Sequence, residues 1–90
     1  MKKTVINEIK ITIPAISENE ALARAYVSVF ASKLDPTVDE LADLRCAVSE
    51  AVTNCVVHAY KGYPAVGKIY INSRLYSDRS VSVEIIDRGC

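Results

Sequence analysis

Three polar side chains, spaced four residues apart, interrupt an almost wholly apolar segment: Glu50, Asn54 and His58. A helix advances about 100° per residue, so residues at this spacing form one slowly drifting stripe. The apolar residues around the stripe, from Cys46 to Val57, indicate that most of the helix is covered. A carboxylate and an amide on such a helix favour a lined binding pocket. The alternative is a structural stripe in which Asn54 bonds to nearby backbone.

Composition excludes several classes of function. The 90 residues suit one small domain, and half of them are hydrophobic. Eleven basic residues balance eleven acidic ones, so the chain lacks the charge pattern of a nucleic-acid or membrane-surface protein. Apolar runs are too short to span a bilayer, and the first residues lead into a strand pattern rather than a signal peptide. We therefore expect a cytoplasmic protein with no direct nucleic acid or membrane partner.

The cysteines agree with a reducing compartment. Cys46 and Cys55 lie nine residues apart on the same expected helix. This spacing separates them by roughly 13.5 Å along the helix axis, and a disulfide needs Cα atoms within about 7 Å. Cys90 is the third cysteine, and none of the three has metal-ligand spacing. We expect three free thiols.

Alternation and capping signals predict a strand followed by two helices. Apolar and polar residues alternate through residues 5–13, which is typical of a strand with one dry face, and Pro14 closes it. Capping boxes at 17–20 and 37–40 predict the helix starts, and the first helix must stop near Leu34 because a proline follows shortly after. The side that this helix is expected to bury comprises Leu22, Ala25, Tyr26, Val29, Phe30 and Leu34.

The second helix is expected to run to about Ala59, and two strands follow it. Alternating apolar residues mark strands at 69–75 and 81–85, with a hairpin turn at 77–80. This order predicts an α+β fold, a two-layer sandwich with two helices on one face of a mixed or antiparallel sheet. Asp87 has the parity of the inward residues of the last strand, so its carboxylate needs a donor. The alternative is a strand-terminal carboxylate that turns back to water.

Two short motifs resemble the two boxes of a known superfamily. Glu50-x-x-x-Asn54 looks like the first box, carried on a helix, of the ATP-binding fold shared by DNA gyrase, the ninety-kilodalton heat-shock chaperone, histidine kinases and MutL. Asp87-x-Gly89 looks like the start of the second box, Asp-x-Gly-x-Gly, at a strand end. The resemblance implies the Bergerat-type ATP-binding fold of this GHKL superfamily.

Within the superfamily, the chain resembles the anti-sigma F factors of sporulation, which are also serine protein kinases. The segments that carry the likeness are residues 34–41, 48–54 and 58–60, and the similarity covers essentially the whole chain. The resemblance implies a protein that sequesters a sigma factor. It further implies that Mg²⁺ and ATP are used to phosphorylate a serine of an anti-anti-sigma factor, and that the protein is a homodimer formed through the sheet.

The resemblance assigns a role to each matching residue. Glu50 would be the catalytic base that orients or deprotonates the acceptor serine, and Asn54 would ligate Mg²⁺ beside the ATP. Asp87 would accept a hydrogen bond from the adenine amino group, and Gly89 would let the backbone approach the nucleotide. His58 would lie beside the nucleotide without a chemical step of its own.

Arg24 lies on the first expected helix. Taken alone it is a solvated charge, but the resemblance places it on the surface that engages the sigma factor and the anti-anti-sigma factor. We expect it to be a partner-binding residue.

The second box departs from the family pattern, because the chain ends at Cys90, before the second glycine. We therefore expect residues 1–90 to be the N-terminal portion of the domain, with half a nucleotide pocket and no useful kinase activity. Two alternatives remain open. One is the ATP-binding domain of a sensor histidine kinase, and the other is a non-catalytic interaction module whose polar stripe is structural.

Overall fold

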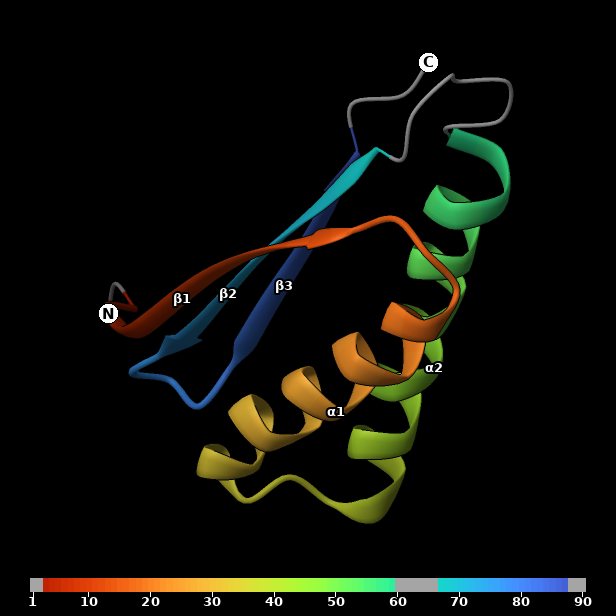
Figure 1. Cartoon of the computed structure of the whole chain (residues 1–90). Helices are drawn as coiled ribbons and strands as arrows, with labels where there is room; N and C mark the ends of the chain where they lie inside the picture. The colour runs from red at the N-terminus through yellow and green to blue at the C-terminus, as the bar shows by residue number, and fades with distance from the viewer. Residues whose placement is uncertain (1–2, 60–66, 88–90) are drawn as a thin grey trace.

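The computed structural model describes residues 3–59 and 67–87, which form two layers (Figure 1). Both helices lie on one side of the sheet, which confirms the predicted α+β sandwich. In chain order the elements are β1 (Val5–Pro14), α1 (Glu18–Ala31), the 3₁₀ turn η1 (Ser32–Leu34), α2 (Val38–Asn54), the π-helix η2 (Cys55–Ala59), β2 (Lys68–Tyr76) and β3 (Val81–Asp87).

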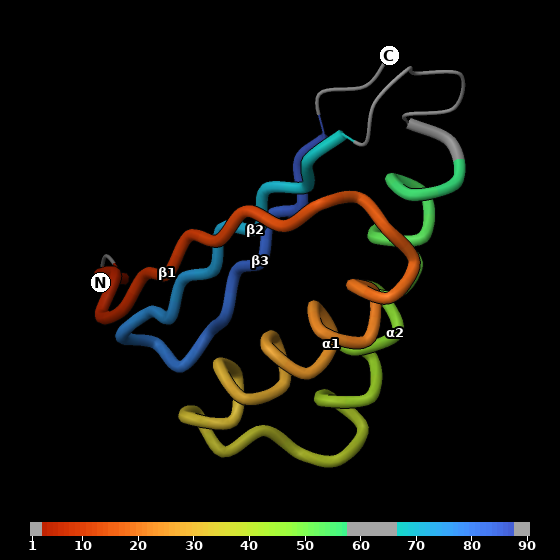
Figure 2. Tube along the Cα trace, in the orientation of Figure 1, coloured from red at the N-terminus to blue at the C-terminus, as the bar shows by residue number. Residues whose placement is uncertain are grey.

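The sheet of the described residues is antiparallel, with β2 between β1 and β3. Figure 2 shows the three strands running alongside one another, with both helices on the same side. The register places Ile71 opposite Ile11 on one side and opposite Ile85 on the other, so side chains of this parity share a face. This is the dry face that the alternation predicted, and on β2 it buries Ile69, Ile71, Ser73 and Leu75.

The core lies between this face and the two helices. Val27 of α1 and Val52 of α2 are fully buried in it. Ser73 is polar and equally buried, and the Tyr26 hydroxyl donates to its Oγ at 3.1 Å. The bond gives both groups a partner, which a buried polar group requires.

The first helix buries only part of the side that its large residues indicated: Phe30 is buried and Tyr26 partly buried as expected, whereas Ala25 is exposed. Leu22 and Val29 are 53% and 68% exposed, so the expected face was wrong for both. The residues that α1 buries are Ala23, Val27, Phe30 and Ala31. Small side chains at four-residue spacing let the helix approach its neighbours closely, and this close contact overrides the larger residues beside it.

The two helix starts differ from each other. At Thr37 the predicted capping box is confirmed: Oγ1 accepts from the Glu40 amide at 3.1 Å, and the Glu40 carboxylate accepts from the Thr37 amide at 2.9 Å. At Ser17 the prediction was wrong, because this residue already has helical backbone angles and its side chain makes no capping bond. The Glu20 carboxylate, which the box would have used, pairs with Arg24 instead.

Candidate functional site

Glu50 and Asn54 lie one turn apart at the C-terminal end of α2. The capping box at Thr37 fixes where this helix begins and therefore which side of it each later residue occupies. Both residues are exposed, so the carboxylate and the amide face away from the core toward a surface open to a ligand. A carboxylate oxygen and an amide oxygen one turn apart can accept hydrogen bonds or ligate a hard cation.

The expectation that most of α2 is covered was wrong. The apolar segment buries only one side, through Val48, Val52 and Cys55. Ala47 is exposed, and Val57 is 50% exposed. In the described structure α2 packs against its neighbour α1 and against one face of the sheet, so the residues on its other side face solvent.

The helix changes character directly after Asn54. Residues Cys55–Ala59 form the π-helix η2, and the backbone of His58 belongs to it. The predicted end of the second helix near Ala59 is confirmed, although its last turn is wider than an α-helical one. Gly89 lies outside the described residues.

Asp87 ends β3, where it pairs with Ile69 of β2 and is partly buried. Its carboxylate Oδ2 accepts a hydrogen bond from the thiol of Cys55, with 3.6 Å between sulfur and oxygen. The donor that the sequence required for Asp87 is therefore present. The contact also joins the strand end of the second motif to the residue that follows Asn54 in the first.

Cys55 was missed as a possible functional residue. The signal for it is its spacing from Val48 and Val52, which places it on the dry side of the helix, as parity places Asp87 on the dry side of its strand. Burial raises the pKa of this thiol to about 11, with the charge of Asp87 as the next cause. Cys55 and Cys46 are both free thiols, as expected.

Arg24 is held between the two helices rather than extended into solvent. Its Nη1 donates to Glu20 at 2.9 Å and to the Ser49 hydroxyl at 3.1 Å, and its side chain is 35% exposed. It borders a shallow hollow whose other lining residues are Ala42, Arg45, Cys46 and Ser49. Sequence reasoning missed Ser49, because no spacing rule relates residues on two helices that lie 25 positions apart.

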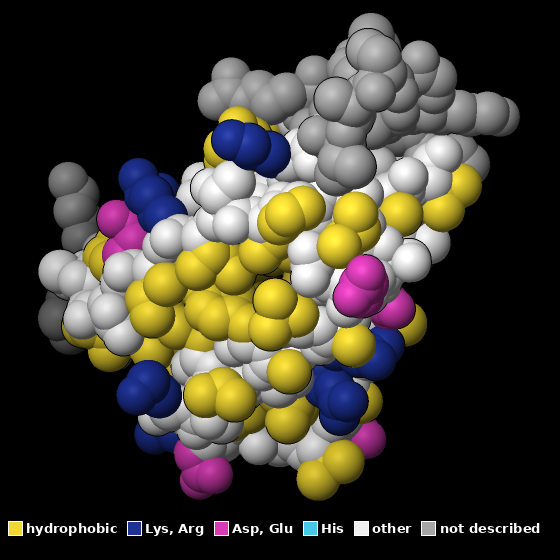
Figure 3. All heavy atoms as spheres, in the orientation of Figure 1, with side chains coloured by type: hydrophobic (Ala, Val, Ile, Leu, Met, Phe, Trp, Pro, Cys, Tyr) yellow, Lys and Arg dark blue, Asp and Glu magenta, His cyan; other side chains and the backbone are white. Residues whose placement is uncertain are grey.

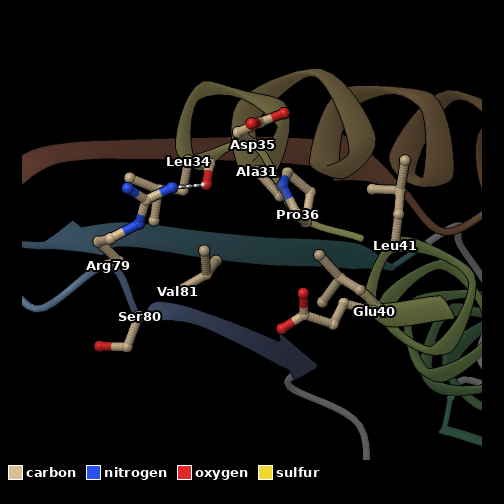
Figure 4. A pocket seen from close by; sticks show the side chains of 10 residues that line it. Ala31, Leu34, Asp35, Pro36, Glu40, Leu41, Arg79, Ser80 and Val81 are labelled. Atoms are coloured by element: carbon tan, nitrogen blue, oxygen red, sulfur yellow. Dashed lines mark hydrogen bonds between the residues drawn. The ribbon is translucent and has the colours of Figure 1, made fainter. Parts of the chain in front are cut away.

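A hollow of about 420 Å³ lies at the opposite end of α2. Figure 4 shows its lining, where Arg79 of the β2–β3 turn donates to the Leu34 carbonyl at 2.9 Å. Glu40 also lines it and is already engaged in the capping box. Fourteen residues separate Glu40 from Asn54, or about 21 Å of helix. This hollow is therefore not part of the candidate site.

The donor set fits a hard cation and a nucleotide. The exposed Asn54 offers an amide oxygen of the type that Mg²⁺ prefers, with the carboxylate of Glu50 one turn away. Within residues 3–59 and 67–87, no three His, Cys, Asp or Glu side chains group to hold a metal by themselves. Mg²⁺ usually keeps several waters and binds through one or two protein oxygens together with substrate phosphates. None of the helices described is long and apolar enough to cross a membrane.

A two-layer α+β domain with an acid–amide pair on a helix, and an acid at the strand end that meets this helix, has the features of an ATP-binding domain of the gyrase and histidine kinase type. Residues 13–90 match the model of one family in this class, described as the histidine kinase-like ATPase domain. The chain belongs to this family.

Its curated relatives include several anti-sigma F factors. The one from Caldanaerobacter subterraneus subsp. tengcongensis is 48% identical over 73 residues, 81% of this chain and 49% of that protein. Those from a Thermoanaerobacter species and from Shouchella clausii are 42% and 43% identical over 83 residues, 92% of this chain and 56% of each protein. The chain thus spans about half the length of the curated relatives it matches.

Proposed function

We propose that the whole protein is a cytoplasmic anti-sigma factor that binds a sporulation sigma factor and, with ATP and Mg²⁺, phosphorylates a serine of its anti-anti-sigma antagonist. The names of the relatives support the first part, and the ATPase family supports nucleotide binding. The same names favour this function over a sensor histidine kinase or a non-catalytic module.

One observation carries the proposal: the 3.6 Å contact between the Cys55 sulfur and the Asp87 carboxylate. Asn54 directly precedes Cys55, and Glu50 lies one turn earlier. The contact therefore brings the end of the helix that bears both residues against the strand end that bears the second motif. A nucleotide bound there would meet groups from both elements.

In this proposal each residue has a separate task. Asp87 accepts from the adenine amino group, the backbone approaches the nucleotide at Gly89, and His58 lies beside it. Asn54 holds Mg²⁺ through its amide oxygen, and the ion supplies charge neutralisation at the phosphates. Glu50 takes the proton of the acceptor serine. Phosphoryl transfer depends chiefly on positioning and electrostatic stabilisation, which these groups provide.

We further propose that residues 1–90 form the N-terminal portion of the nucleotide-binding domain. The match of the family model to residues 13–90 supports this placement, as does a chain length about half that of the relatives. Phosphate contacts would then come largely from outside the described residues.

The partner surface in this proposal includes Arg24. Its guanidinium is fixed by Glu20 and Ser49, so a partner side chain meets a group that has already lost much of its rotational freedom. Exposure of about a third of the side chain leaves it accessible to a partner.

Homodimer formation is proposed through β1. This strand of ten residues lies at the edge of the described sheet. Figure 3 shows hydrophobic side chains gathered over β1 and α1, and the large ones that are exposed on these elements are Val5, Ile6, Ile9, Leu22 and Val29. An open strand edge beside apolar surface favours pairing with a second copy.

The test uses two arginines in matched settings. Arg24 pairs with Glu20, and Arg74 pairs with Glu8, with side chains 35% and 32% exposed. In the whole protein, Arg24→Ala should weaken sigma-factor binding about tenfold or more and leave ATP affinity unchanged, as expected for a central interface arginine. Arg74→Ala should change neither. Surface plasmon resonance with the sigma factor and nucleotide titration measure both, and absence of sigma-factor binding by the wild type contradicts the proposal.

A further inference from the structure

The α-helix α2 changes into the π-helix η2 at Cys55, directly after the candidate site residue Asn54. The Cys55 amide is shared between the carbonyls of Ala51 and Val52, and the wider helix begins at this residue. Short π-helical segments are rare and occur frequently at functional sites. Here the π-helical segment begins at Cys55, whose side chain contacts Asp87 at the end of β3.

Cys55 is held tightly in place. It is 4% exposed and belongs to the core cluster with Val48, Val52 and Ile69. Its thiol donates to Asp87 Oδ2 across 3.6 Å. In this contact the thiol is the donor and the carboxylate is the acceptor.

The acceptor of this bond is less deeply buried than the donor. Asp87 ends β3 and is only partly buried, and the orientation of its carboxylate about the Cβ–Cγ bond depends on the groups that contact it. A donor fixed in the core restrains this rotation and directs the carboxylate. An ionised carboxylate only accepts hydrogen bonds, so it pairs with the amino group of adenine and not with the carbonyl that guanine has at the same position.

We propose that Cys55 is a positioning residue for nucleotide recognition: its S–H holds the Asp87 carboxylate in the orientation that accepts from adenine and discriminates against guanine. The inference rests on the proposed role of Asp87 in binding ATP. It adds a group that helps to set the geometry of that contact, and it assigns a function to a core cysteine.

The experiment compares three substitutions of Cys55 in the whole protein by calorimetric titration with Mg-ATP and Mg-GTP. Cys55→Val fills the space of the side chain but has no hydrogen-bond donor. Cys55→Ala has no donor and also leaves part of the space empty. Cys55→Ser keeps a donor. The Val and Ala variants should each lower the ATP affinity roughly fivefold and reduce the ATP-to-GTP affinity ratio by a similar factor, as for the loss of one ordinary hydrogen bond. Ser should stay within about twofold of the wild type in both quantities.

The controls separate packing from positioning. Cys46→Ala removes the exposed thiol of the same helix and should leave both affinities unchanged. Thermal unfolding shows which variants are folded at the titration temperature, and the Ser and Val variants decide the result even if the Ala cavity unfolds the protein. Ser and Val variants with the same affinity ratio overturn the inference, because only one of them has a donor.

Asp87→Asn distinguishes failure of this inference from failure of the proposed function. If Asp87→Asn binds ATP as the wild type does, the nucleotide role of Asp87 is wrong and the inference falls with it. If Asp87→Asn weakens binding while Cys55→Val does not, only the inference is wrong. If the inference and the proposed role of Asp87 are both right, Cys55→Val should not lower ATP affinity further in a protein that already carries Asp87→Asn, since the two residues act through one contact.

Discussion

Glu50 and Asn54 have different surroundings from Cys55 and Asp87. Both are exposed on α2, whereas Cys55 is buried and Asp87 is partly buried. An exposed carboxylate suits a base that must reach a hydroxyl on another protein, because the acceptor arrives from solvent. A buried donor and a partly buried carboxylate suit recognition of a flat ring, because both need fixed geometry.

The proposed base gives the first prediction. Glu50→Gln in the whole protein should lower the rate of serine phosphorylation at least a hundredfold and leave ATP affinity within about twofold, since general-base catalysis contributes about 10²–10⁴. Radiolabelled phosphate transfer to the anti-anti-sigma protein measures the rate, and calorimetry measures the affinity. Glu84→Gln, on β3, is the control, and a wild-type rate for Glu50→Gln would remove this residue from the chemistry.

The proposed metal ligand behaves differently, because its loss weakens binding itself. Asn54→Ala should lower the affinity for ATP about tenfold or more in the presence of Mg²⁺, which is typical of a lost ligand, and change it little with EDTA. Titrations with and without Mg²⁺ measure this difference. Equal affinities of wild type and variant under both conditions would mean that the polar stripe is structural.

At the scale of elements, the sequence predicted most of what capping and periodicity control. The order of strands and helices, the dry face of β2 and the capping box at Thr37 are all confirmed. The buried side of α1 was predicted only in part, because packing selected small residues such as Ala23 over larger ones such as Leu22. The Ser17 box failed for a similar reason, since Arg24 competes for the carboxylate of Glu20.

The capping box of α2 should make stability depend on pH. The hydrogen bond from the Thr37 amide, and then its hydroxyl contact, hold the pKa of Glu40 below its ordinary value of 4.5. A lowered pKa in the folded state means that the stabilisation is present above about pH 4.5 and is lost as pH falls through the folded value. The stability difference between wild type and Glu40→Gln should therefore shrink from pH 7 to pH 3.

Urea unfolding of both proteins at several pH values measures this difference. Glu18→Gln, at the start of α1 where no capping box forms, is the control and should show a smaller change with pH. A difference between wild type and Glu40→Gln that is constant from pH 7 to pH 3 would mean that the charge of Glu40 adds nothing to the cap.

At the scale of the whole molecule, local patterns predicted the parts of the candidate site but not how they meet. Spacing identified Glu50 and Asn54, and parity identified Asp87 as an inward carboxylate that needs a donor. Its donor, Cys55, lies 32 residues away on another element, as Ser49 lies far from Arg24. Such contacts depend on how the helices are placed on the sheet, and no local pattern contains that information.

An apolar groove between a helix and a strand gives the last prediction. A groove of about 280 Å³ runs between α2 and β3, lined by Ala47, Ala51, Val83 and Ile85 among others. The chain has no net charge to oppose association. A polypeptide of residues 1–90 should therefore self-associate through this groove in addition to pairing through β1, which gives assemblies larger than a dimer. Ala47→Glu places a charge in the groove at an exposed helical position and should weaken association beyond the dimer about tenfold.

Ala42→Glu is the matched control, because this residue is also an exposed alanine of α2 but borders the hollow beside Arg24. Both substitutions add the same charge to the same helix, so a general effect of charge would appear in both. Sedimentation equilibrium of the wild type and the two variants measures the association constants. A wild type that forms nothing larger than a dimer would contradict the prediction, and equal weakening by both substitutions would show that net charge, rather than the groove, controls association.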